Sequence, residues 1–341
     1  MVEGAGSDAY RPITMLELSD ILGEICGSFA QVAAPQSELY WLHLLSAAGL
    51  VFGIYWLRRC RNDGASIRGF LAFCFPRNIY AHPSARLDFR YFAANTALYG
   101  AFIAPLLLTS SAVAYGTVSI LVGLFGVPSG PTLRGGVWAD FAVTVAAVIV
   151  ADIGFFVAHR LQHRVAFLWE FHKVHHSAEV LHPLALYRRH PVDAALDVTL
   201  MGTGAGAVLG LSSYIFGESV EGLSILNTNA VLFLFHFAGV HLRHSHVRLS
   251  YGRFLDRILI SPTLHQTHHS CAPPHLDKNF GGILSIWDWL AGSLCIPHDD
   301  ETLTLGLPDG EHRDYGSVID LYLLPIAKNA RRLRSRVRRV A

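Results

Sequence analysis

The 341-residue chain is unusually apolar: 52% of its residues are hydrophobic and only 16% are charged, against about a quarter charged in an average soluble domain. This balance indicates a membrane protein. The formal net charge is +1, so no overall field attracts nucleic acid, and we expect no nucleic-acid partner. The five cysteines form no CxxC pair and no regular framework, which argues against a disulfide scaffold or a zinc ribbon.

Five apolar runs approach the roughly 20 residues that a helix needs to cross the hydrocarbon core of a bilayer. In chain order they are residues 40–57, 91–113, 138–158, 194–215 and 220–237. The last two should form a helical hairpin that turns near Gly217 and Glu218. A sixth run, residues 115–127, is short and contains three glycines, so we expect it to lie at the membrane interface or to re-enter.

Arginines gather between Arg58 and Arg90 and again in the tail, at positions 331, 332, 334, 336, 338 and 339. Positive charge beside membrane helices marks the cytoplasmic side. The expected fold class is therefore all-α, a polytopic membrane helical bundle of about four to six membrane helices that is capped by a cytoplasmic, histidine-rich layer.

Histidine is concentrated in one part of the chain, because 15 of the 19 histidines lie between residues 159 and 275. Residues three and four apart share one face of a helix, so a cluster with this spacing can direct two or three imidazoles at one point. One such cluster alone is about as often a coincidental surface feature as a ligand set. Three in order, each beside a membrane segment, indicate metal binding. They are His159-Arg-Leu-Gln-His163, His172-Lys-Val-His175-His176 and His265-Gln-Thr-His268-His269.

The number of imidazoles predicts two metal ions. Neutral imidazole suits iron, zinc, copper and nickel, and eight imidazoles exceed what one ion can bind. His190 and His244 lie at the two feet of the predicted apolar hairpin and would come close to the same layer, although an isolated histidine is more often structural. Five other histidines could either orient the metal ligands or simply lie at the membrane interface: His182, His236, His241, His246 and His275.

At these residues the sequence resembles the fatty acid hydroxylase superfamily, which includes sterol desaturases and sphingolipid hydroxylases. The resemblance covers about residues 138–295. The matching segments are 152–163, 169–177, 188–191, 244–249, 261–269, 279–281 and 287–288. Two departures are His246, where an asparagine is common, and residues 289–293, which replace a basic residue and a Phe-Gly-Thr ending. Neither departure removes a ligand.

The resemblance implies which residues form a di-metal centre. Its metal ligands would be His159, His163, His172, His175, His176, His190, His244, His265, His268 and His269, and the eight residues of the three clusters would be the catalytic set. Supporting residues would be Asp152, His182, Asn279 and Asp288.

The resemblance also implies a chemistry. A membrane-bound non-haem di-iron oxygenase would use two iron ions, O2 as co-substrate and external electrons to hydroxylate a C–H bond of a fatty acyl, sterol, sphingolipid or aminolipid substrate. Because no segment resembles a haem, flavin or ferredoxin domain, the electrons should come from a separate protein of ferredoxin or cytochrome b type. The basic segments could dock that carrier, although contact with anionic membrane lipids is the more ordinary use of such charge.

This interpretation divides the chain into three parts. Residues 1–137 would hold membrane-anchoring helices and a basic cytoplasmic segment, residues 138–300 a catalytic domain like that of the fatty acid hydroxylases, and residues 301–341 a segment with a basic tail. The active site would face the cytoplasm, in a bacterial inner membrane or, in a eukaryote, in the endoplasmic reticulum.

Three alternatives remain. A lipid or sterol desaturase would use the same centre and share the first hydrogen abstraction. A histidine-rich membrane metal transporter or sensor would place its ligands within the spans, whereas these lie at or beyond their ends. A bis-histidine haem protein would need facing pairs at membrane depth, which adjacent histidines such as His175 and His176 do not favour.

Overall fold

The structure of the chain is a computed structural model that describes residues 18–340 except 60–63, 65, 99–107, 129, 131, 132, 134, 218, 219, 221, 299 and 300. The described part is mostly helical, which confirms the predicted fold class. Its α-helices are α1 (Leu18–Val32), α2 (Trp41–Arg59), α3 (Ile67–Cys74), α4 (Arg77–Tyr80), α5 (Pro83–Leu98), α6 (Ser110–Phe125), α7 (Val137–Arg164), α8 (Ala166–His176), α9 (Pro191–Phe216), α10 (Ala230–Phe237), α11 (Pro262–His268), α12 (Ile286–Ala291) and α13 (Val318–Val340). Short 3-10 turns are η3 (Pro183–Tyr187), η5 (Val240–His244), η6 (Leu255–Arg257), η7 (Pro273–His275) and η8 (Pro308–Asp314), and β1 (Ser224–Ile225) pairs with β2 (Thr228–Asn229) in an antiparallel hairpin.

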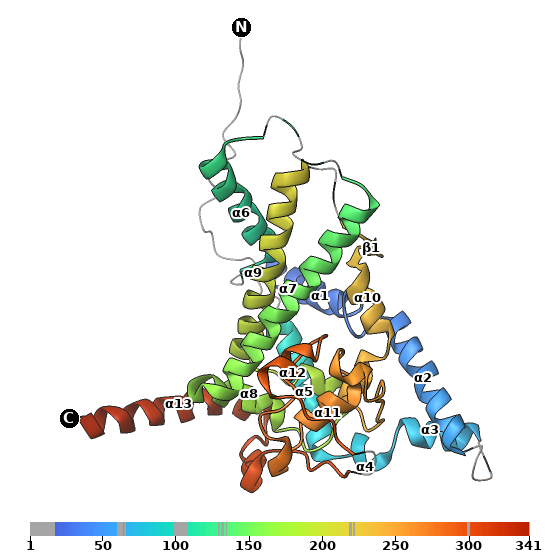
Figure 1. The fold of residues 1–341 in the computed structure, drawn as a ribbon. Coiled ribbons are helices and arrows are strands. Elements are labelled where there is room, and N and C mark those ends of the chain that lie inside the picture. Colours follow the sequence, from blue (N-terminus) through green and yellow to red (C-terminus); the bar gives the residue numbers. More distant parts are fainter. Residues whose placement is uncertain are drawn as a thin grey trace.

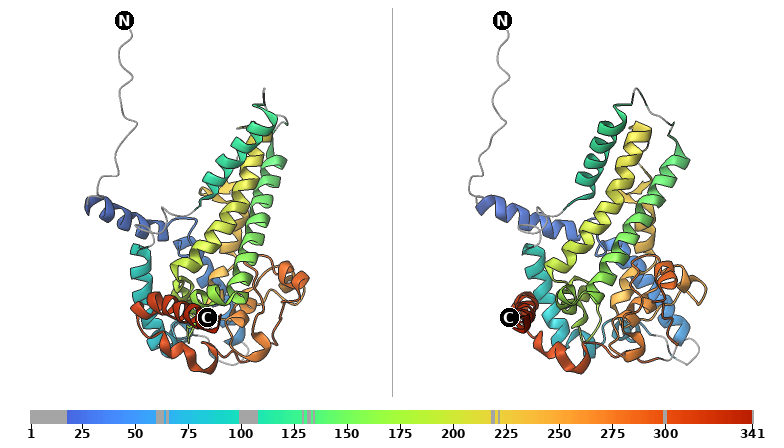
Figure 2. Two further views of the ribbon diagram at one scale, coloured as in Figure 1. Left: turned by 90° about the vertical axis from the view of Figure 1, so that its left-hand side faces the viewer. Right: turned by 60° about the vertical axis from the view of Figure 1, so that its left-hand side comes forward.

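Three helices form a stalk that rises from a broader body (Figure 1). α7 and α9 lie side by side, and α6 packs against the half of α9 that is remote from the body (Figure 2). Among the described residues, α2, α7 and α9 are the helices long and apolar enough to cross a membrane, and α6 is apolar but has only 16 residues. The described part of the chain thus has three candidate membrane spans, against the four to six that we expected for the whole chain.

Glycines let the stalk helices approach each other closely. A Cβ atom at Gly154 of α7 would lie 2.5 Å from the carbonyl oxygen of Leu200, and one at Gly204 of α9 would lie 2.7 Å from a carbonyl oxygen of α7. On the side of α9 that faces α6, a Cβ atom at Gly206 would lie 2.4 Å from the carbonyl oxygen of Ser110. The helices therefore meet backbone to backbone, as is typical of small residues between membrane helices.

Replacing Gly206 with valine should weaken the stalk. The new Cβ atom would meet the backbone of Ser110, which cannot move away without separating α6 from α9. We expect a loss of about 1–3 kcal/mol in the free energy of unfolding, measured as a lower midpoint in thermal unfolding of the detergent-solubilised protein. Gly53→Val is the matched control, because Gly53 lies in apolar α2 with no atom within 4 Å of its Cβ position. Equal midpoints for the two variants would contradict the close contact.

Two of the five predicted spans do not form. The run 91–113 is not one helix, because Leu108 and Thr109 are non-helical and α6 begins at Ser110; residues 99–107 lie outside the described part. α5 belongs to the body, where its Asp88 is buried, and a charged side chain of this kind does not suit a lipid-facing helix. The run 220–237 holds β1, β2 and the 8-residue α10, which covers only about 12 Å. The predicted second arm of the apolar hairpin is therefore wrong.

The run 115–127 also differs from the expected interfacial segment. It makes up most of α6, which stands along α9 in the stalk (Figure 2). The reason lies in α9, where a Cβ atom at Gly210 would be 2.5 Å from the carbonyl oxygen of Ala114. The groove that these glycines leave in α9 determines where α6 packs.

The body gathers around the end of the stalk where α7 ends and α9 begins. A buried apolar cluster joins α5, α8 and the region of α13; its members are Leu87, Tyr91, Val174, Leu307, Tyr315 and Leu321. α8 is thereby held in place directly after α7. The rest of α13 projects from the body (Figures 1 and 2) and exposes the arginines of the predicted basic tail up to Arg338.

Candidate metal centre

The last two turns of α7 direct two imidazoles into the body. The Nδ1 atom of His159 donates to the carbonyl oxygen of Phe280 at 2.8 Å, and Nδ1 of His163 lies 3.5 Å from Oδ1 of Asp277. The Nε2 atoms of both rings are buried and have no hydrogen-bond partner within the described part of the chain. A neutral imidazole that donates through Nδ1 carries a lone pair on Nε2, so His159 presents a free metal-binding atom to the interior.

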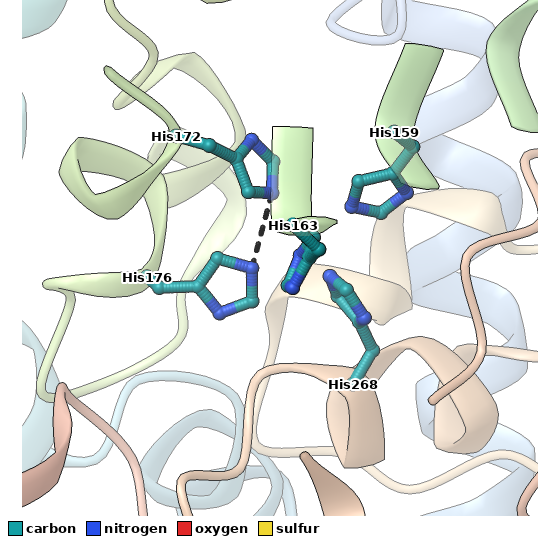
Figure 3. A group of neighbouring side chains, drawn as sticks. All are labelled: His159, His163, His172, His176 and His268. Carbon is teal, nitrogen blue, oxygen red and sulfur yellow. Dashed lines mark hydrogen bonds between the residues drawn. The ribbon is translucent and has the colours of Figure 1, made fainter. Parts of the chain in front are cut away.

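Three more imidazoles complete this first cluster (Figure 3). From α8, His172 donates through Nδ1 to Oδ1 of Asp193 at 2.8 Å, and its Nε2 lies 3.1 Å from Nε2 of His176. From α11, His268 donates through Nδ1 to the carbonyl oxygen of Lys278 at 2.7 Å. One ligand atom from each of the five rings lies within 4.8 Å of all the others: His159, His163, His172, His176 and His268.

A second cluster consists of His175 from α8, His244 from η5, and His265 and His269 from α11 and its C-terminus. The Nε2 atom of His244 lies 3.3 Å from that of His175, 3.1 Å from that of His269 and 3.1 Å from that of His265. Ligands about 2.1 Å from one ion, at angles of about 90–110°, are separated by roughly 3.0–3.4 Å. The spacing of the four nitrogen atoms therefore fits a single metal ion.

Adjacent histidines belong to different clusters. His175 and His176 are consecutive on α8 but contribute to the second and first cluster, and His269 and His268 divide in the same way. The rings of His176 and His269 stack with centroids 4.8 Å apart, so the two clusters are in direct contact. This division gives the two HxxHH motifs a geometric meaning, because each serves both clusters.

Burial disfavours the charged form of six of the cluster imidazoles. Desolvation lowers the pKa of His268 to about 3. It also lowers the pKa of five others well below the usual value: His175, His176, His244, His265 and His269. Neutral imidazole is the form that binds a metal ion. Both clusters are therefore suited to metal binding near neutral pH.

Two predicted supporting residues hold the loop 280–284 against α7. Asp288 accepts hydrogen bonds from two backbone N–H groups of this loop at 2.9 and 2.7 Å, and Asp152 accepts two more at 2.7 and 2.9 Å. The carbonyl group of Phe280 is thereby fixed where His159 donates to it. The two carboxylates thus orient a cluster histidine through the backbone.

Asn279 supports α11. Its side chain donates to the carbonyl oxygens of Leu264 and Cys295 at 3.0 and 2.8 Å and accepts from the N–H group of Cys295 at 2.7 Å. Its φ of 57° lies in the left-handed region, which asparagine tolerates better than most residues. The side chain links α11, which carries His265 and His268, to the segment after α12.

Two predicted residues are placed elsewhere. His190 belongs to neither cluster, because its Nδ1 accepts from the N–H group of Val192 at the start of α9 and its Nε2 donates to the carbonyl oxygen of Tyr322 at 3.2 Å. Both ring nitrogens are thus engaged, and His190 caps a helix. His182 donates to Asp88 at 2.9 Å instead of orienting a cluster histidine. Its position just before η3 brings it to α5.

The sequence reasoning missed the carboxylate that holds His172. Asp193, in the first turn of α9, is fully buried and also accepts from Nε of Arg189 at 2.9 Å. Arg189 pairs with Asp197 as well. A charged residue at the start of an apolar helix is costly without such a use, and that cost was the available signal.

A cavity of about 290 Å³ extends from the clusters into the stalk. Apolar side chains of α7, α9 and α10 line it, including Val148, Met201 and Leu232. Histidines from both clusters line it as well: His159, His172, His175, His244 and His265. An apolar chamber that ends at two sets of imidazoles can hold a hydrocarbon chain beside both of them.

The family of this region follows from comparison with known proteins. Residues 144–293 match the family model described as fatty acid hydroxylase. This part of the chain is a fatty acid hydroxylase domain. Both clusters lie within this hydroxylase domain, and the resemblance noted in the sequence is confirmed.

Several curated proteins are similar to the hydroxylase domain. An ornithine lipid hydroxylase of Rhizobium tropici is 31% identical over 170 residues, which are 50% of this chain and 47% of that protein. An alkylglycerol monooxygenase of Danio rerio is 30% identical over 157 residues (46% of this chain and 31% of the relative). A Delta(7)-sterol 5(6)-desaturase of Eremothecium gossypii is 27% identical over 152 residues (44% and 36%). The chain thus spans about half the length of the first relative and about a third of the length of the other two. No solved structure matches the chain.

Proposed function

We propose that the hydroxylase domain binds two iron ions and uses O2 and external electrons to hydroxylate a C–H bond of a membrane lipid. The observation that carries this proposal is the apolar cavity whose lining includes histidines of both imidazole clusters. A transporter would not need two adjacent clusters beside such an apolar chamber.

The chain's own residues would determine how the ions are held. The nine cluster histidines would be the ligands, and Asp193, Phe280 and Lys278 fix three of them by accepting from Nδ1. Iron bound there would supply the reductive activation of O2 and the abstraction of a hydrogen atom. Apolar side chains of α7, α9 and α10 would exclude water and hold the lipid chain beside the clusters.

The substrate, partner and location follow from the same reasoning. The relatives named for ornithine lipid and alkylglycerol support a polar lipid as substrate, and the first of them favours an aminolipid among the classes expected from the sequence. A separate ferredoxin or cytochrome b type protein would supply electrons. The clusters would face the cytoplasm, on the side of the exposed arginines of α13. A relative named as a sterol desaturase keeps desaturation as the second candidate reaction.

Mass spectrometry of lipid extracts tests the proposal. Cells that express the chain should contain a lipid with one additional oxygen atom that cells expressing His268→Ala lack; loss of two hydrogen atoms would identify a desaturase instead. The purified protein should contain two irons per chain and show no Soret band. Identical lipid extracts, or a protein that loads no iron, would refute the proposed function.

A further inference from the structure

The cavity beside the clusters has a polar corner that metal binding does not use. Glu38, His236 and Arg243 line it together, at the junction of α2, α10 and η5. Elsewhere the cavity is lined by metal-suited imidazoles, by apolar side chains and by charged groups that already have partners, such as Asp197 with Arg189. These three side chains therefore need an explanation of their own.

Arg243 is a buried cation with few partners. It is 8% exposed, one of its N–H groups donates to the carbonyl oxygen of Gly282 at 3.0 Å, and its guanidinium lies 5.5 Å from the ring centre of Phe235. No carboxylate of the described residues forms an ion pair with it. A guanidinium has five N–H donors, and burying its charge without an anion is costly. The guanidinium therefore has N–H donors that no anionic acceptor among the described residues pairs with.

Two carboxylates of the cavity wall act on Arg243 through their charge, those of Glu38 and Asp152, but neither forms an ion pair with it. Asp152 accepts hydrogen bonds from Ile283, Leu284 and the indole N–H of Trp287, so its oxygens are already used. Apart from the hydrogen bond to Gly282, the N–H donors of Arg243 are thus open to an anionic group in the cavity.

Glu38 and His236 add complementary groups. The backbone carbonyl of Glu38 accepts from His241, but in the described part of the chain its carboxylate has neither a hydrogen bond nor an ion pair. The Nδ1 atom of His236 is buried and has no partner among the described residues. The corner thus offers a carboxylate without an ion pair, a buried cation and an uncharged ring nitrogen beside an apolar chamber.

We propose that this corner binds the head group of the lipid substrate, with an anionic group on Arg243 and an ammonium group on Glu38. Arginine binds carboxylate and phosphate through two parallel N–H donors, so either could be the anion. The inference rests on the proposed function, because it names the class of lipid, a zwitterionic amphiphile, whose chain would lie in the apolar part of the cavity.

Binding of four single-chain lipids to the purified iron-loaded protein tests this inference. The probes are Nα-lauroyl-ornithine (carboxylate and ammonium), lysophosphatidylethanolamine (phosphate and ammonium), N-lauroylglycine (carboxylate alone) and monolauroylglycerol (uncharged). Native mass spectrometry would give the dissociation constants. We expect one of the two zwitterions to bind at least about 10-fold more tightly than monolauroylglycerol, as a charged hydrogen bond predicts, and the tighter of the two identifies the anion.

Variants separate the two charges. Arg243→Gln should abolish any preference for N-lauroylglycine over monolauroylglycerol and should reduce the preference for the zwitterions, whereas Arg243→Lys should retain part of both because the charge remains. Glu38→Gln should weaken only the ammonium-bearing probes. Arg253→Gln is the matched control, because Arg253 is exposed on the loop before η6.

The outcomes distinguish this inference from the proposed function. Equal binding of charged and uncharged lipids by the unaltered protein, or an undiminished preference in Arg243→Gln, would overturn the head-group site. Iron content and lipid oxidation, measured on the same preparations, test the proposed function separately. Normal iron and oxidation without any head-group preference would refute this inference alone, and a normal iron content in Arg243→Lys would show that a change in binding does not reflect misfolding.

Discussion

Alanine at His175 or at His268 should reduce lipid oxidation to the level of the metal-free protein and should lower the iron content at the same time. The two residues belong to different clusters, so each variant removes one ligand from one proposed ion. We expect loss of about one of the two irons in each case, because the remaining cluster keeps its own ligands. Metal analysis of the purified variants and mass spectrometry of lipid extracts would measure both effects.

His298→Ala is the control for these variants. Its imidazole is exposed and belongs to neither cluster, so both iron content and product should stay unchanged. A variant of His175 or His268 that still oxidises lipid, or that still binds two irons, would show that its ring is not a ligand.

Asparagine at Asp193 should weaken metal binding by about 10–100-fold, as is typical when the partner of a ligating histidine is altered. The carboxylate accepts from Nδ1 of His172 and so leaves the lone pair of Nε2 facing the first cluster. The amide keeps the shape of the side chain but removes its charge, so the tautomer and the orientation of His172 are held less firmly. Competition with a chelator of known affinity would measure the change without reference to activity.

Asp256→Asn serves as the matched control for this position. Asp256 is equally buried, but it accepts hydrogen bonds from Ser250 and Tyr251, far along the chain from α8. Its replacement should leave the metal affinity unchanged. If Asp193→Asn binds metal as tightly as the unaltered protein, the carboxylate does not position His172, and its role is limited to the ion pair with Arg189.

Much of the candidate site could be predicted because it depends on local spacing. His172, His175 and His176 lie within little more than one turn of α8, and the spacing of three or four residues places them on one face of that helix whatever surrounds it. The same holds for His265, His268 and His269 around α11. Local geometry did not show which ring joins which cluster, since that depends on the position of α11 opposite α8.

Isolated residues were harder to assign. His190 and His244 look alike in the sequence, since each stands beside an apolar run, yet His244 joins the second cluster and His190 caps α9. The difference arises from the chain around them: Pro191 starts a helix whose first N–H groups need an acceptor, and His190 supplies it. Asp193 was missed because its partner His172 lies 21 residues earlier, on another helix.

The sequence by itself determined the apolar, helical character of this protein, the resemblance of residues 138–295 to the fatty acid hydroxylases and the set of imidazoles able to bind metal, because composition and helical periodicity are local properties. The tertiary structure decided how those imidazoles divide into two clusters, which carboxylates and carbonyls orient them, and which apolar runs become long helices. Apolar content alone cannot separate a span from a core segment, since both are buried from water. The packing partners make that distinction. The glycines of α9 hold α6 in the stalk, and the buried apolar cluster of the body holds α5.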